Sequence, residues 1–145
     1  MALSTFLREA GHQQVALTRS PIGHFHTGGT LNGRRVDVLL DTGAASTVVS
    51  LAVAREHGIT LNKLDLTGGG TGGANLEIHA FVGAKLSLGK VQPRPRALLA
   101  MDLTHVNQSL ALKGEAPVDV ILGADVFEAQ AAVIDYGSSS LFLKP

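Results

Sequence analysis

The sequence predicts an all-β domain, either a barrel or a sandwich built from many short strands. Apolar runs of strand length recur along the chain, and several of them alternate apolar with polar residues. Turn residues, including 17 glycines, separate these runs, whereas segments with helical spacing are few and short. Since sheets of short strands need frequent turns, we predict an all-β fold with two or three short helices.

The first half of the chain is expected to contain one clear hairpin between two short helices. Residues 1–14 carry apolar side chains at helical spacing and are expected to form a separate, partly helical N-terminal segment. Residues 23–40 flank Asn32-Gly33, a pair that favours a tight hairpin because both residues tolerate positive φ. Ser50 can cap a second short helix that ends at Gly58.

The second half is expected to consist of strands and one more polar segment. Residues 102–118 are polar enough for a helix and loop inserted into the β framework, within a single domain that spans residues 15–145. A glycine cluster, residues 68–73, separates two of the expected strands. The strands and hairpins expected here are residues 59–67, 76–82, 86–92, 96–101 and 141–145.

The composition argues against several classes of function. The 145 residues suit one domain, and the formal net charge of zero gives no electrostatic basis for binding nucleic acid or a membrane surface. Cysteine is absent, which removes disulfides, cysteine nucleophiles and thiolate metal sites. No apolar run approaches the ~20 residues of a membrane span, and the N-terminus lacks the features of a secretion signal. We expect a soluble protein and leave a cytoplasmic or periplasmic location open.

Two segments of the chain resemble each other. Residues 36–44 read VDVLLDTGA and residues 118–124 read VDVILGA, so each is an apolar strand that leads to Gly-Ala. Two related half-structures in one domain explain this similarity, although buried runs of Val, Ile and Leu are common enough for coincidence. The difference between the two segments matters more, because only the first carries an acid at the end of its strand.

The acid at the end of the first segment is the main candidate for chemistry. Asp41 follows the apolar run from Val38 to Leu40, which places a carboxylate at the mouth of the core. Gly43 permits a tight turn, and Thr42 offers a hydroxyl that can brace a neighbouring loop. An Asx-turn with no catalytic role is the alternative, because Asp-x-Gly forms one easily.

The order of several motifs resembles the retropepsin-like aspartic peptidases, from retroviral proteases to their bacterial and eukaryotic single-domain relatives. The resemblance extends over residues 15–145. It rests on the hairpin before the acid, on Leu39-Leu40-Asp41-Thr42-Gly43-Ala44, on the glycine-rich segment at the place of the family's flap, and on Ile121-Leu122-Gly123 running into a helix. It implies an acid-protease barrel with a flap hairpin.

The resemblance also implies an aspartic endopeptidase with two Asp41 side chains, one from each copy of a homodimer, and with no cofactor or metal. Two carboxylates about 3 Å apart repel each other by roughly 5 kcal/mol, so one proton stays on the pair, which holds a water between its two members. The other implied site residues are Thr42, Gly43 and Ala44 beside the acid, Gly69, Gly70, Thr71 and Gly72 in a flap over a peptide or protein substrate, and Ile121, Leu122 and Gly123 in the core behind the site.

The sequence departs from the retroviral pattern at two places. Ala45 stands where those enzymes often have a second Asp, and Ala124 stands where they often have Arg. In those enzymes the two charged residues help to fix the dimer and the substrate, so their replacement leaves the form of the dimer open. A catalytically silent module that binds peptides or dimerises, and a β-barrel that binds a small ligand, are the alternatives to an enzyme.

Two further patterns do not support a site. Residues 68–73 contain the G-x-G-x-x-G spacing, but they lead into a strand rather than a helix, so we do not expect a dinucleotide site. His24 and His26 alternate on one strand face, as metal ligands do, but the sequence shows no third ligand. An exposed strand edge is the preferred interpretation, and no metal site is predicted.

Overall fold

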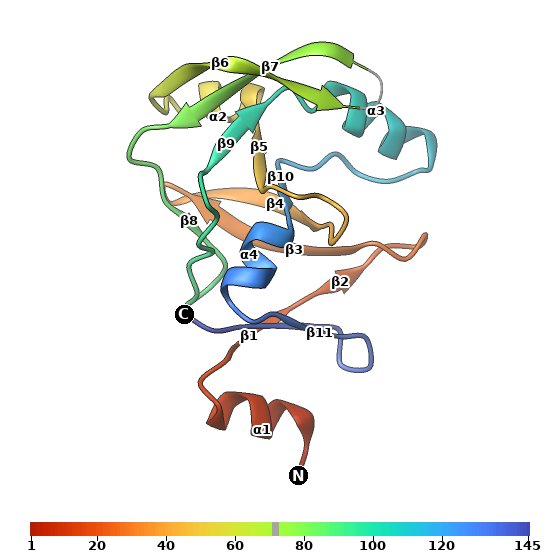
Figure 1. Ribbon diagram of the computed structural model, residues 1–145. Coiled ribbons are helices and arrows are strands. Elements are labelled where there is room, and N and C mark those ends of the chain that lie inside the picture. Colours follow the sequence, from red (N-terminus) through yellow and green to blue (C-terminus); the bar gives the residue numbers. More distant parts are fainter. Residues whose placement is uncertain (71–72) are drawn as a thin grey trace.

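The computed structural model describes residues 1–70 and 73–145, which form two β-sheets and four short helices (Figure 1). The helices are α1 (Leu3–Glu9), α2 (Leu51–Glu56), α3 (Thr104–Leu112) and α4 (Ala124–Ala129). The larger sheet contains β2 (Thr18–Arg19), β3 (Phe25–Leu31), β4 (Arg34–Leu40), β5 (Val48–Ser50), β6 (Leu61–Gly70), β7 (Gly73–Phe81), β8 (Leu86–Ser87), β9 (Leu99–Met101) and β10 (Val120–Leu122). The smaller sheet contains β1 (Gln13–Ala16), β11 (Val133–Asp135) and β12 (Ser140–Leu143).

The predicted all-β class is confirmed, with two corrections. The described residues contain four helices rather than two or three, because every segment with helical spacing forms at least one turn. The path of the larger sheet, β2-β3-β4-β10-β5-β9-β7-β6 with β8 beside β3, is open in the described part of the chain rather than a closed barrel. None of the four helices combines the length and the apolar character needed to cross a membrane.

Local turn chemistry places the first hairpin and the second helix as predicted. Leu31 pairs with Arg34, so the β3–β4 turn has two residues, and both Asn32 and Gly33 have positive φ (49° and 81°). The hydroxyl of Ser50 accepts a hydrogen bond from the amide of Val53 at 3.4 Å and caps α2. The chain then leaves α2 through Gly58, which has a φ of 66°.

The two similar segments of the sequence lie side by side at the centre of the larger sheet. β10 runs parallel to β4, with Val120 opposite Val38 and Leu122 opposite Leu40, which is the register of the sequence match itself. Val38, Val120 and Leu122 are completely buried in the main core. Burial of such side chains contributes about 1.5–3 kcal/mol each. The two segments therefore have similar apolar residues because both pack into the same core.

Asp37 and Asp119 occupy equivalent places in this pairing, and the side chain of Asp119 bonds the backbone of Asp37. The amide of Asp37 donates to Oδ2 of Asp119 at 2.8 Å, and the amide of Asp119 donates to the carbonyl of Asp37 at 2.9 Å. The two bonds extend the β4–β10 pairing by one residue toward the N-terminal ends of the strands. This side-chain bond fixes the register against a slip, which would turn every side chain to the opposite face.

The expected flap hairpin is present as β6 and β7, which lie at the opposite end of the molecule from α1 (Figure 1). β7 pairs with β9, β9 runs parallel to β5, and β5 pairs with β10. The hairpin is therefore joined through three strand pairs to the centre of the sheet. Leu51, Ala54 and Ala100 pack beneath it against Leu61 and Phe81.

A buried glutamine holds the C-terminal strand against the segment before β9. Gln130 follows α4 and is completely buried. Its side chain accepts from the amide of Arg94 at 2.7 Å and donates to the carbonyls of Gln92 (3.1 Å) and Lys144 (3.0 Å). Three segments distant in sequence thus meet on one amide group, which satisfies polar backbone atoms inside the protein.

We expect Gln130→Leu to lower the free energy of unfolding by about 3 kcal/mol, because it leaves three backbone groups without their partner. Urea denaturation of the two proteins measures the difference. The matched control is Gln92→Leu, since Gln92 is exposed and only its backbone carbonyl is used. This control is expected to stay within about 0.5 kcal/mol of the wild type, and equal effects of the two substitutions would contradict the role given to Gln130.

Candidate active site

Asp41 lies at the tip of a tight loop that begins where β4 ends. Its amide donates to the carbonyl of Leu122 at 3.0 Å, so the β4–β10 pairing continues to the acid itself. The amide of Gly43 donates to Oδ1 of Asp41 at 2.9 Å, and the amide of Ala44 donates to its carbonyl at 3.1 Å. The Asx-turn considered from the sequence is therefore formed, and it orients the carboxylate.

The acid and its two neighbours are exposed to solvent in the single chain. Asp41, Thr42 and Gly43 are all exposed, whereas Ala44 is half-buried. Asp41 takes part in none of the ion pairs found within the described residues. The carboxylate is thus held in place by backbone amides and presented outward, free to meet a group from outside the chain.

The end of β10 supports this loop from beneath, and only glycine fits there. A Cβ added to Gly123 would lie 2.8 Å from the carbonyl oxygens of Ala44 and Ser46, closer than such atoms approach in proteins. The next amide, that of Ala124, donates to the carbonyl of Ala44 at 2.7 Å. Gly123 therefore allows the close backbone contact that fixes the position of the Asp41 loop against the end of β10.

The other two residues predicted behind the site face different parts of the core. Leu122 is completely buried in the main core, beside Val38 and Val120. Ile121 points to the opposite face of the strand, as alternation requires, and packs in a second cluster with Leu39. The predicted trio of Ile121, Leu122 and Gly123 therefore meets the site through Gly123, while the two apolar residues anchor the strand.

A buried pair, Thr47 and Asp125, joins the loop to the start of α4. Thr47 is completely buried, and its hydroxyl donates to Oδ1 of Asp125 at 2.8 Å while accepting from the amide of Gly123 at 3.0 Å. Asp125 lies in the first turn of α4, but Gly123 occupies the cap position and the carboxylate of Asp125 bonds Thr47. Thr47 was not among the residues predicted for the site, because its partner lies 78 residues away in the sequence.

The predicted flap is described only in part. Gly69 and Gly70 end β6, and Gly70 pairs with Gly73 at the start of β7. Thr71 and Gly72 lie outside the described residues. The pairing of β6 with β7 shifts register twice, between Lys63 and Thr67 and between Gly68 and Gly70, as β-bulges do.

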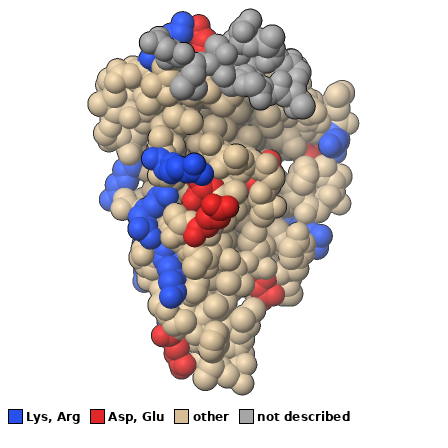
Figure 2. Space-filling model, in the orientation of Figure 1, with Lys and Arg blue, Asp and Glu red and all other residues tan. Residues whose placement is uncertain are grey.

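An apolar hollow opens beside Thr42. Its volume is about 300 Å³, and its lining comes from the Asp41 loop, α4 and the start of β11: Thr42, Ala124, Phe127, Glu128, Ala132 and Ile134. On the face that carries α4 in Figure 1, basic side chains line one flank, acidic ones form a small group, and most of the area is uncharged (Figure 2). The lining of the hollow itself is mostly apolar, so it can accept an apolar group from outside the chain.

We expect Thr47→Val to lower the free energy of unfolding by about 2–3 kcal/mol, because it keeps the side-chain shape and removes both hydrogen bonds of a buried hydroxyl. Denaturant titration provides the measurement, with the exposed Thr60→Val as the control. In a double-mutant cycle with Asp125→Ala, the double mutant should lose less stability than the sum of the two single losses, since the two residues share one bond. Strictly additive losses would show that the two side chains act independently.

Comparisons with known proteins agree with this architecture. A family model described as aspartyl protease matches residues 27–126. The solved structure of a retropepsin-like aspartic protease from Rickettsia conorii is similar at 18% identity, with a TM-score of 0.57 and a match over 92% of this chain and 89% of that one. No curated protein matches the chain.

Two further solved structures share the fold. The retroviral protease-like domain of Ddi1 from Leishmania major is 17% identical, with a TM-score of 0.53 and coverage of 81% of this chain and 86% of that domain. The EIAV protease in complex with the inhibitor HBY-793 is 24% identical, with a TM-score of 0.52 and coverage of 77% and 92%.

The matched family segment begins in β3 and ends in α4, so it includes both the Asp41 loop and Gly123 beneath it. It spans more than half of the 145 residues. Family and fold together point to a hydrolase of the aspartic protease type. The chain belongs to the aspartyl protease family and has the retropepsin-like fold.

Proposed function

We propose that the protein is an aspartic endopeptidase in which two copies of the chain each supply Asp41 to one active site. The single observation that supports this best is the register of β4 and β10. Since Leu40 lies opposite Leu122, the place equivalent to Asp41 on the other strand is Gly123. One chain therefore carries one acid at the ends of these two strands, and a pair of acids needs a second chain.

The dyad supplies both halves of an acid–base mechanism. With two carboxylates about 3 Å apart, mutual repulsion of roughly 5 kcal/mol keeps one proton on the pair. The ionised carboxylate takes a proton from the water held between the two acids. The protonated one donates to the scissile carbonyl, so the water adds to form a diol without a covalent enzyme intermediate. The C–N bond then breaks as the first carboxyl passes its proton to the departing nitrogen and the diol returns a proton to the other carboxylate. The amide of Gly43, 2.9 Å from Oδ1 of Asp41, holds each carboxylate in orientation for these steps.

The exposed position of the acid supports assembly into a homodimer. Asp41, Thr42 and Gly43 project from the surface of the single chain, and the apolar hollow lies directly beside Thr42. A twofold axis near Asp41 would bring the two loops together and cover both hollows. Water excluded from the pair would then strengthen each electrostatic contact in the site.

The substrate best suited to this arrangement is an extended peptide. β6 and β7 form a hairpin whose end is rich in glycine, and glycine has no side chain to keep a peptide backbone away. A peptide strand laid between the hairpin and the Asp41 loops can pair with exposed backbone groups, and its side chains then determine selectivity. Thr71 and Gly72 are included in the proposed flap on the basis of the sequence.

A catalytically silent peptide-binding module remains the second candidate, and one observation favours it. The Asx-turn formed by Asp41 and Gly43 gives the acid a structural role that needs no chemistry. A tight-binding transition-state mimic, such as a statine peptide, distinguishes the two functions. Binding of the mimic together with cleavage of a peptide library supports the enzyme, whereas binding without any cleavage supports the silent module.

We expect Asp41→Asn to abolish peptide hydrolysis, because an amide in place of the carboxylate cannot accept the proton of the water. Cleavage of an unbiased peptide library, followed by mass spectrometry across pH 4 to 7, measures the loss, which should reach at least ~10²-fold. Asp37→Asn is the matched control, since it changes an exposed acid on the same strand whose side chain lies away from the loop tip. Unchanged cleavage by Asp41→Asn would overturn the assignment.

Mixing the two proteins tests whether the site is shared between copies. If each site needs one Asp41 from each chain, activity at fixed total protein should fall with the square of the wild-type fraction as Asp41→Asn protein is added. Addition of the Asp37→Asn protein should instead leave the activity constant. A fall in direct proportion to the wild-type fraction would mean that each chain acts alone.

A further inference from the structure

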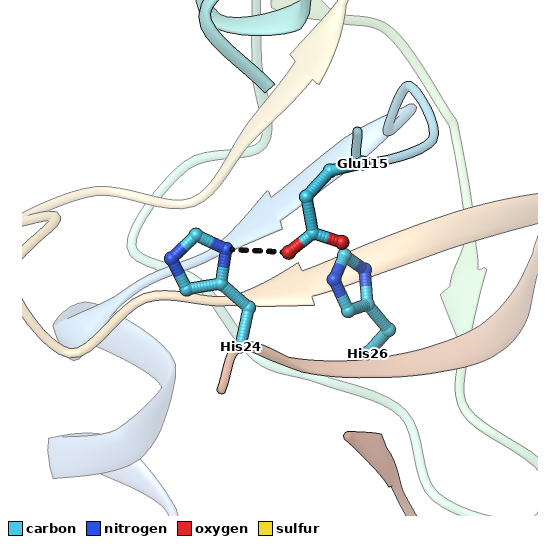
Figure 3. Close-up of side chains that lie close together, drawn as sticks. All are labelled: His24, His26 and Glu115. Atoms are coloured by element: carbon cyan, nitrogen blue, oxygen red, sulfur yellow. Dashed lines mark ion pairs between the residues drawn. The ribbon is translucent and has the colours of Figure 1, made fainter. Parts of the chain in front are cut away.

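Three side chains that can bind a metal converge at the beginning of β3 (Figure 3). His24 directly precedes the strand and His26 is its second residue, so both rings project from the same face. Glu115 arrives from the segment between α3 and β10. One ligand atom from each residue lies within 4.8 Å of the others, and Nδ1 of His24 lies 3.3 Å from Oε1 of Glu115.

This grouping contains a third possible ligand that the sequence did not show. The two histidines were recognised as a possible pair, and no metal site was predicted because a third ligand was missing. Glu115 supplies it from 89 residues beyond His26, within the segment expected to be inserted into the β framework. No local pattern could show this contact, because the fold alone brings the loop to the strand.

The three side chains bring buried atoms together, and the two imidazole rings have unused bonding capacity. Within the described residues, Nε2 of His26 and Nδ1 of His24 are buried atoms without a hydrogen-bond partner, although His24 forms an ion pair with Glu115. The side chain of Glu115 is only 5% exposed. Buried polar atoms in folded proteins are nearly always paired, so these two imidazole nitrogens have the capacity for a partner that the described residues do not supply.

The backbone around the ligands is held in place by a tight turn. The amide of Ser20 donates to the carbonyl of His24 at 2.8 Å, and the amide of His24 donates to the hydroxyl of Ser20 at 3.1 Å. The same hydroxyl donates to Oε1 of Glu115, whose amide in turn bonds the carbonyl of Leu110 at 2.9 Å. The ligands therefore sit on fixed elements, which lowers the entropy lost when they close on an ion.

We propose that His24, His26 and Glu115 bind one Zn²⁺ ion, with water at the fourth position. Two imidazoles and one carboxylate are a ligand set that zinc accepts, and tetrahedral bonds of 2.0–2.2 Å place neighbouring ligand atoms roughly 3.4 Å apart. The His24–Glu115 pair already has this spacing at 3.3 Å. A hollow of about 300 Å³, lined in part by His26 and Glu115, gives the ion and its water a path from solvent.

Bound zinc would tie the segment after α3 to the first strand of the central hairpin. Glu115 lies between α3 and β10, and β10 carries Gly123 beneath the Asp41 loop. The ion would therefore stabilise the folded chain without touching the acid. The alternative is a simple ion pair between His24 and Glu115, which would leave His26 out of any interaction and would give no preference for a transition metal.

Calorimetric titration of untagged, chelator-treated protein with Zn²⁺ alone tests the site. We expect saturable one-to-one binding and a rise in Tm on addition of the metal. His24→Ala, His26→Ala and Glu115→Gln should each weaken the affinity at least ~10-fold, because each removes one of three protein ligands. His57→Ala and His105→Ala are the matched controls and should bind as the wild type does.

Two checks keep the outcome unambiguous. Circular dichroism without metal shows whether each variant is folded. If an alanine variant is unfolded, Glu115→Gln still tests the site, because it preserves the shape of the side chain. Co²⁺ as a second probe should give the strong visible absorption of a tetrahedral site in the wild type and lose it in His26→Ala. Absence of one-to-one binding by the wild type, or equal affinity in the ligand variants and the controls, would overturn the proposal. None of these readouts depends on peptide hydrolysis.

Discussion

The parallel pairing of β4 with β10 is the constraint on which the rest of the site depends. It joins segments about eighty residues apart in one register, with Leu40 opposite Leu122, and buries Val38 and Val120 in the same layer. The contacts that position Asp41 then follow from the ends of these two strands. The Leu122 carbonyl accepts the Asp41 amide, and Gly123 lets the loop approach the backbone beneath it. A one-residue slip would move the acid to the other face of the sheet.

The features that could be predicted from the sequence are those encoded within a few residues. Asn32-Gly33 specifies a two-residue turn because both positions need positive φ, and Ser50 caps α2 through an amide three residues away. The resemblance between residues 36–44 and 118–124 also predicted equivalent strands, and their pairing in matched register confirms it. For these elements, backbone geometry and alternation of apolar residues carry enough information.

The contacts that could not be predicted join single side chains across long sequence separations. Thr47 bonds Asp125, Gln130 bonds the amide of Arg94, and Glu115 meets His24, yet none of these pairs has a periodic signature. A buried threonine before Val48 looks like any strand residue until its partner is known. The role of Asp125 is equally hidden, since an acid near the start of a helix usually caps it, whereas this one bonds Thr47.

In this chain, the residues that form the core are distinct from the exposed acid. The core is closed within one copy, because Val38, Val120 and Leu122 are completely buried without any partner chain. The chain therefore has no need of dimerisation to cover its apolar interior. Asp41, by contrast, is exposed, and the equivalent place after β10 is taken by Gly123 rather than by a second acid. If two chains share one site as proposed, assembly itself would be the switch, since dilution would remove the pair of acids and leave two folded chains.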